Sequence, residues 1–197
     1  MTLDTTLYDC EVELIEPMLG TVPKDKKVYS NFIASKAADA GLAEEEEATC
    51  VEDLEAKGWT SFHQDDEGPF IYDYLVKGVL KNAAQTLKQF GVLKQLNSKV
   101  TRYIFVYPRR IRLPEITEEA LERPLRAQTA KGERVTVVKS DVIPAGTKLK
   151  FQIETLDCGG ITRGCLETLL DYGKRCGLGQ FRNGSYGRFK VLKLEEV

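Results

Sequence analysis

Apolar and polar residues alternate strictly near the start of the chain, in the stretch LYDCEVELI at residues 7–15. A period of two residues is typical of a β-strand with one buried and one open face. The buried face would comprise Tyr8, Cys10, Val12 and Leu14, and the open face Asp9, Glu11 and Glu13. The pattern therefore predicts a half-buried strand whose open face is acidic.

The period changes to that of an α-helix in two later stretches. The first, YDYLVKGVLKNAAQTLKQFG, occupies residues 72–91, with Asp73 as the expected N-cap and Gly91 as the expected residue after the C-cap. The second, GGITRGCLETLLDYGKRCG, occupies residues 159–177. The predicted buried stripes are Val76, Val79, Leu80, Ala83, Ala84, Leu87 and Phe90 in the first helix, and Ile161, Cys165, Leu166, Leu169, Leu170 and Cys176 in the second.

Three further segments predict strands. TRYIFVYP at residues 101–108 is apolar on both faces, which favours a central strand ended by Pro108. Residues 134–156 predict a hairpin that turns at Pro144–Gly146, with Leu149, Phe151 and Ile153 pointing inward. YGRFKVLKL at residues 186–194 predicts the closing strand.

The resulting order is strand, helix, strand, strand, helix, strand. It predicts an α+β fold of the ferredoxin-like βαββαβ type, RRM-like, in which two helices cover one face of an antiparallel sheet. We expect a single domain over residues 1–197 with two insertions, an acidic one at about 21–68 without a strong period and a hairpin-bearing one at about 113–146. Because unrelated proteins share this fold, it does not define a function.

Charge is distributed unevenly along the 197 residues, although the net charge is only −2. Residues 1–70 hold 5 basic and 17 acidic side chains, a balance of −12, whereas residues 71–197 hold 23 basic and 13 acidic ones, a balance of +10. One interpretation is a protein with a side that faces nucleic acid and a side that repels it. The other is a solvated surface on which both signs mix after folding.

The composition excludes several classes of protein. No run of about eighteen apolar residues is present, and the first residues are acidic, which favours a soluble cytoplasmic protein without a membrane partner. The five cysteines, Cys10, Cys50, Cys158, Cys165 and Cys176, form no CxxC pair, so buried reduced thiols are expected and no metal or other cofactor is indicated.

Glycines concentrate in CGLGQFRNGSYGRF at residues 176–189, which contains Gly177, Gly179, Gly184 and Gly187. Such density predicts positive φ angles or close approach by another group. The segment resembles the glycine-rich loop of the RAMP superfamily, the RNA-binding repeat proteins of CRISPR systems, although two residues instead of one separate the last glycines. A helix cap followed by a wide turn is the alternative explanation for these glycines.

Two more segments resemble the same superfamily, most closely the backbone subunits of type III effector complexes. DEGPFIYDYLVKGVLKNAA at residues 66–84 is similar to the family segment that leads into the first helix, with Lys77 and Gly78 at its Lys-Gly positions. Residues 123–153 look like the hairpin that precedes the second helix. The family turn of small residues before the Lys-Gly pair is replaced here by Tyr72, Asp73, Tyr74 and Leu75.

The resemblance implies a single-stranded RNA-binding protein whose partners are RNA, other copies of itself or CRISPR effector subunits. Glycine amides would bind phosphates, arginines would add charge-assisted hydrogen bonds, and Phe181 and Tyr186 would stack on bases or lie in the core. Arg109, Arg110 and Arg112 would extend the basic surface or form a solvated loop. The predicted RNA-binding residues are Lys77, Gly78, Lys81, Gly177, Gly179, Arg182, Asn183, Gly184, Tyr186, Gly187 and Arg188.

Catalysis has little support in the sequence, and no catalytic residue is assigned. His63, the only histidine, is expected on the surface of an acidic loop, and the adjacent carboxylates Asp65, Asp66 and Glu67 do not favour a convergent Mg²⁺ site. Type III backbone subunits cleave target RNA with a loop aspartate, which has no clear counterpart here. Two alternatives stay open: a phage or mobile-element protein derived from this superfamily that mimics or caps an effector complex without RNA, and a metal-dependent endoribonuclease.

Overall fold

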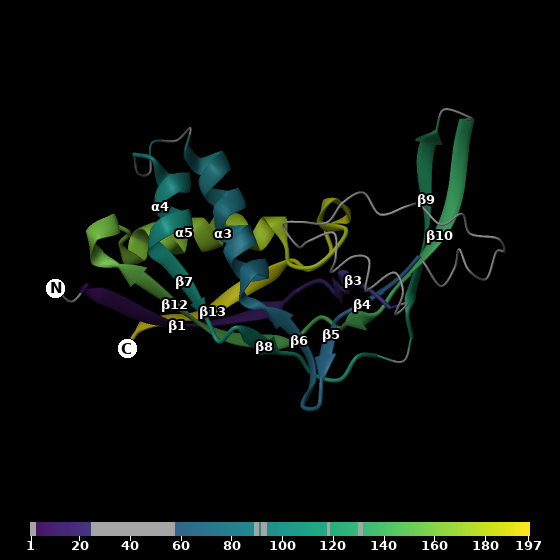
Figure 1. The fold of residues 1–197 in the computed structure, drawn as a ribbon, viewed down its shortest axis with the longest axis horizontal. Coiled ribbons are helices and arrows are strands. Elements are labelled where there is room, and N and C mark those ends of the chain that lie inside the picture. Colours follow the sequence, from purple (N-terminus) through teal and green to yellow (C-terminus); the bar gives the residue numbers. More distant parts are fainter. Residues whose placement is uncertain (1–2, 25–57, 89–90, 92–93, 118, 130–131) are drawn as a thin grey trace, which may run out of the picture.

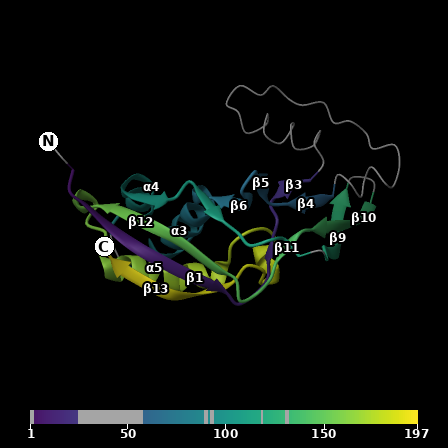
Figure 2. The ribbon, with the colours of Figure 1, turned by 90° about the horizontal axis from the view of Figure 1, so that it is seen from below.

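The computed structural model describes residues 3–24, 58–88, 91, 94–117, 119–129 and 132–197. These residues form a mixed α+β structure around a four-stranded antiparallel sheet in the order β13-β1-β12-β7. The strands are β1 (Thr5–Leu14), β7 (Ile104–Tyr107), β12 (Lys148–Leu156) and β13 (Phe189–Glu196), and the helices are α3 (Asp73–Leu87), α4 (Leu96–Tyr103) and α5 (Arg163–Cys176). The helices cover one face of this sheet (Figure 1), and the other face is open (Figure 2).

Strand β1 lies inside the sheet and pairs with β12 on one side and β13 on the other. Its predicted inward face is confirmed, because Tyr8, Cys10, Val12 and Leu14 are all buried. The inward residues of β12, which are Leu149, Phe151 and Ile153, are buried beside them, also as predicted. These side chains and the apolar stripes of α3 and α5 form one core.

The open face of β1 is not an acidic surface, because lysines of the two neighbouring strands neutralise it. Glu11 lies 3.5 Å from Lys148, and Glu13 lies 2.8 Å from Lys190. Such cross-strand pairs stabilise a sheet modestly, and they make this face one of mixed charge. The prediction of an acidic open face, which considered β1 alone, is therefore wrong.

The two predicted helices are present, and their buried stripes largely agree with the prediction. Tyr72 and not Asp73 is the N-cap of α3, and the helix ends before Gly91, which has a positive φ of 68°. Helix α5 begins after Thr162, whose hydroxyl accepts a hydrogen bond from the backbone N–H of Cys165 at 3.3 Å. This is the usual N-cap arrangement.

The segment predicted as a central strand is divided between a helix and an edge strand. Residues up to Tyr103 belong to α4, and only Ile104–Tyr107 form β7. Strand β7 lies at the edge of the sheet, and its side chains alternate, so that Ile104 and Val106 are buried while Phe105 and Tyr107 are exposed. A short apolar run does not distinguish a helix end from a strand, which explains the wrong prediction.

The predicted hairpin at Pro144–Gly146 is also wrong in its pairing. β10 (Gly132–Ser140) pairs with β9 (Leu121–Thr129) in a long hairpin at the far end of the molecule from both termini (Figure 1). β11 (Val142–Ile143) pairs with β2 (Met18–Leu19), and β4 (Trp59–Ser61) joins β10 to β3 (Val22–Pro23). The turn at Pro144–Gly146 therefore separates two sheets.

A third small sheet combines β5 (His63–Asp65), β6 (Gly68–Tyr72) and β8 (Arg110–Arg112). Strands β4 and β5 fall within residues 21–68, where the sequence shows no strong period, and residues 25–57 of that insertion lie outside the described part. His63 is 8% exposed, which contradicts its predicted surface position. It stacks on Phe70 with ring centroids 5.5 Å apart, and burial lowers its pKa.

Two of the described cysteines are buried thiols, as expected. Burial raises the pKa of Cys10 to about 12 and raises that of Cys165. Cys158 is exposed and Cys176 is half-buried, contrary to the prediction, and Cys50 lies outside the described residues. Within the described ranges, no helix is long and apolar enough to cross a membrane.

Candidate nucleic-acid interface

The glycine-rich loop after α5 is closed by hydrogen bonds within the protein. The N–H of Gly177 donates to the carbonyl of Gly173 at 3.1 Å, and the N–H of Leu178 donates to the carbonyl of Gly187 at 2.9 Å. The N–H of Gly187 donates to Pro17 at 2.8 Å, and that of Gly184 to Phe181 at 2.9 Å. The amides of Gly177, Gly184 and Gly187 are therefore already bonded and are not free for phosphate, contrary to the role expected for them.

Packing between two backbone segments explains why glycine is needed in this loop. Gly187 has a φ of 70°, and a Cβ there would overlap the backbone of Leu178, with the carbonyl carbon 2.8 Å away. Gly177, with a φ of 77°, would place a Cβ 3.0 Å from the carbonyl carbon of Gly187. The cap-and-turn explanation thus accounts for these two glycines.

The loop and α3 together enclose a hollow of about 230 Å³. Helix α3 contributes one wall, and a Cβ at Gly78 would meet nothing within 4 Å. The loop contributes the opposite wall. The lining residues are Tyr74, Leu75, Gly78 and Val79 from α3, and Leu178, Gly179 and Arg182 from the loop. The structure therefore brings together the two segments that the sequence analysis selected separately.

Arg182 lines this hollow, and Lys81 follows Gly78 by about one turn of α3 on the same side of the helix. Arg182, Asn183 and Arg188 are exposed on the loop, and Lys81 is exposed on α3. Neither Arg182 nor Lys81 has an ion-pair partner within the described part of the chain. Arg182 is close enough to lower the pKa of Cys176 against the larger upward effect of burial, and the Cys176 thiol contacts the Asn82 Oδ1 atom at 3.9 Å.

Lys77 points away from the hollow, toward the edge of the main sheet. Its ammonium group donates a hydrogen bond to the carbonyl of Ile104 and lies 5.1 Å from the centre of the Phe105 ring. Burial, with a further effect from Lys81, lowers the pKa of Lys77. Lys77 therefore covers the exposed edge of β7.

Aromatic rings that the sequence analysis did not group continue from the hollow to the small sheet. Tyr74, 53% exposed, stacks on Tyr72 with centroids 5.4 Å apart, and Tyr72 contacts Phe70 edge-on at 5.1 Å. Arg109 lies over Tyr72 at 5.4 Å, and Arg110 lies over Phe70 at 5.1 Å. The alternation of rings in PFIYDY was the available signal for this ladder.

Asp65 is held by arginines of the neighbouring strand. Its carboxylate lies 2.7 Å from Arg110 and 2.5 Å from Arg112, and Glu67 also pairs with Arg112. The hydrogen bond from Arg112 lowers the pKa of Asp65 to about 2. Within the described ranges, no group of three or more histidine, cysteine or acidic side chains is arranged to hold a metal ion.

Comparison with known proteins finds similarity to solved structures but not to protein-family models or curated sequences. No protein-family model matches the chain, and no curated protein matches its sequence. A chain in the cryo-EM structure of the type III-B Cmr-beta complex bound to cognate target RNA is similar with a TM-score of 0.48 and 12% identity. The match covers 98% of this chain and 61% of that one, so this chain spans about three fifths of its length. This similarity assigns neither a family nor a site residue.

Proposed function

We propose that this protein is a RAMP-like single-stranded RNA-binding subunit of the CRISPR type, and that its main sheet is ferredoxin-like with the two predicted insertions. The strand order β13-β1-β12-β7 with α3 and α5 on one face supports the fold proposal. The resemblance of three sequence segments to the RAMP superfamily, one of them to type III backbone subunits, supports the functional proposal. Its partners would be RNA and other copies of itself or effector subunits.

The hollow between α3 and the glycine-rich loop is the observation that carries this proposal. Arg182 and Lys81 beside it are exposed cations without ion-pair partners within the described part of the chain, which suits them to phosphate groups. Tyr74, which stacks on Tyr72, adds aromatic surface to the wall of the hollow. RNA is therefore bound by side chains around the hollow, and the loop amides keep the loop in shape.

A second candidate is supported by the charge of the N-terminal part. The balance of −12 over residues 1–70 suits a protein that mimics or caps an RNA-binding complex without RNA of its own. We assign no nuclease step to either candidate, because the carboxylate of Asp65 is occupied by two arginines.

Fluorescence anisotropy with a labelled single-stranded RNA of about twenty nucleotides tests the proposal. We expect binding whose affinity falls as salt rises, with a slope of log K against log salt of about 0.7 for each phosphate contact. The matched RNA duplex is the control and should bind more weakly, because its paired bases and stiff helix do not fit a site for a flexible single strand. Absence of single-strand binding at low salt would contradict the proposal and support the second candidate.

A further inference from the structure

Arg123 is a buried arginine at the base of the β9–β10 hairpin, where it contacts the glycine-rich loop. Its side chain is only 7% exposed. One guanidinium nitrogen, Nη2, donates to the Ser140 hydroxyl at 2.9 Å and to the Gln180 Oε1 atom at 3.4 Å. The Ser140 hydroxyl and Gln180 Oε1 also bond to Thr60. Arg123 therefore connects the β9–β10 hairpin to Gln180 of the glycine-rich loop.

The other two guanidinium nitrogens, Nε and Nη1, are buried and have no hydrogen-bond acceptor among the residues that the structure describes. No described carboxylate forms an ion pair with them, and the aromatic ring of Phe181 is the group that lies over the guanidinium. Burial lowers the pKa of Arg123, and Tyr186 opposes that effect. A buried charge without its acceptors is strongly unfavourable, and such groups in a folded protein are normally paired. The site thus provides donors for an anion that would satisfy them.

The side chain next to these nitrogens lies on a strained turn. The ring of Phe181 lies 4.5 Å from the Arg123 Cζ atom, yet the residue is 43% exposed, so it separates the guanidinium from solvent. Phe181 has a φ of 54° and Ser185 a φ of 71°, conformations that are unfavourable for residues other than glycine. The cover over Arg123 is therefore one half-exposed ring on a strained backbone.

We propose that Arg123 binds a phosphate group of the RNA strand after the Phe181 ring moves aside, an inference that rests on the proposed function. The Nε–H and Nη1–H groups point from different edges of the guanidinium, so each can donate a charge-assisted hydrogen bond to a separate phosphate oxygen. Gln180 and Phe181 contact Arg123, and the next residue, Arg182, lines the hollow. The proposed phosphate positions at Arg123 and at Arg182 are thus linked by consecutive loop residues. The displaced Phe181 ring can then stack on a base of the RNA.

The Arg123→Met variant tests this assignment, because methionine retains an apolar side chain and removes the charge. We expect the salt slope for single-stranded RNA to fall by about 0.7 and the affinity at 0.1 M salt to fall about fivefold. The thermal midpoint should stay the same or rise, because replacement of a poorly satisfied buried charge by an apolar residue is neutral or stabilising. Arg102→Met, which removes an exposed arginine of α4, is the matched control and should change neither quantity.

The outcomes separate this inference from the function on which it rests. If the wild-type protein binds RNA and Arg123→Met binds it with the same slope, Arg123 is not a phosphate ligand. A lower thermal midpoint with an unchanged slope assigns Arg123 a purely structural role and also overturns the inference. If the wild-type protein binds no RNA, the proposed function fails. A second measurement, the increase of the thermal midpoint by tripolyphosphate, then tests whether Arg123 is part of a phosphate site. Stabilisation of the wild type but not of Arg123→Met supports a phosphate site, and equal effects on both reject it.

Discussion

The Gly187→Ala variant is expected to unfold about 10 °C below the wild-type protein. A left-handed conformation costs a residue with a Cβ about 1–2 kcal/mol, and overpacking against the Leu178 backbone adds about 1–3 kcal/mol. In a chain of 197 residues, each kcal/mol shifts the thermal midpoint by about 2–4 °C. Thermal unfolding followed by circular dichroism measures the difference.

Gly146→Ala is the matched control for this prediction. Gly146 has a similar positive φ of 84°, but a Cβ there would meet nothing within 4 Å. It should lose only the conformational part, about 1–2 kcal/mol, so the difference between the two variants isolates the contact with Leu178. Equal losses in both variants would contradict the close packing of the loop. Loss of RNA binding by Gly187→Ala at full stability would restore a direct role for its amide.

The double variant Lys81→Ala/Arg182→Ala is expected to bind single-stranded RNA about 25-fold more weakly at 0.1 M salt. Each removed phosphate contact lowers the salt slope by about 0.7, so two contacts lower it by about 1.4. The thermal midpoint should change little, because both side chains are exposed and have no ion-pair partner within the described part of the chain. Anisotropy titrations at four or more salt concentrations give affinity and slope together.

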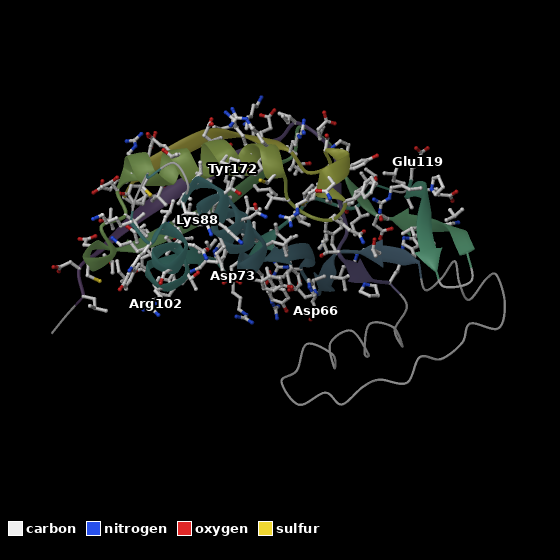
Figure 3. The ribbon with its side chains drawn as sticks, turned by 90° about the horizontal axis from the view of Figure 1, so that it is seen from above. Asp66, Asp73, Lys88, Arg102, Glu119 and Tyr172 are labelled. Carbon is white, nitrogen blue, oxygen red and sulfur yellow. The ribbon has the colours of Figure 1, made fainter. Side chains whose placement is uncertain are left out.

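The double variant Lys88→Ala/Arg102→Ala removes the same charge away from the hollow. Neither residue lines the hollow, and Figure 3 shows Lys88 and Arg102 on the side of the molecule away from the β9–β10 hairpin. This control should retain most of the affinity, apart from a small general effect of net charge. Equal weakening in the two double variants would show that binding depends on total charge and not on this site.

The sequence predicted the buried residues best in elements with a single clear hydrophobic period. The period of two in β1 and the period near 3.6 in α3 and α5 identified most of the buried residues, because one face of each element packs on the core. Leu87 and Cys176 are only partly buried, and Phe90 lies outside the described residues. The expected α+β class followed from the order of these elements. Charge on the open sheet face could not be predicted from β1 alone, since Lys148 and Lys190 are supplied by distant segments.

Predictions that depended on pairing between segments were less successful. Nothing local shows that β10 pairs with β9 and β4 and not with β12, because strand pairing depends on the whole sheet. His63 was expected in water because acidic residues follow it, yet Phe70 and Tyr72 cover it from the next strand. In both cases, contacts between distant segments determine the structure: the pairing of β10 and the burial of His63.

The candidate site shows the same division between local and distant information. Glycine density identified the loop, but the sequence did not show that the loop packs on itself and on Pro17, which removes most glycine amides from consideration. The hollow requires α3 and the loop to lie together, which only the fold provides. The burial of Arg123 could not be predicted, because an isolated arginine in a strand carries no local signal of burial.

Cross-linking of single-stranded RNA that contains 4-thiouridine tests the central claim most directly, because it reports where the strand lies on the protein. After irradiation and digestion, mass spectrometry should find cross-linked peptides from residues 73–82 of α3 and from residues 178–188 of the loop. Cross-links confined to the open sheet face, at Phe105 and Tyr107, would place the RNA on the sheet and contradict a site between α3 and the glycine-rich loop.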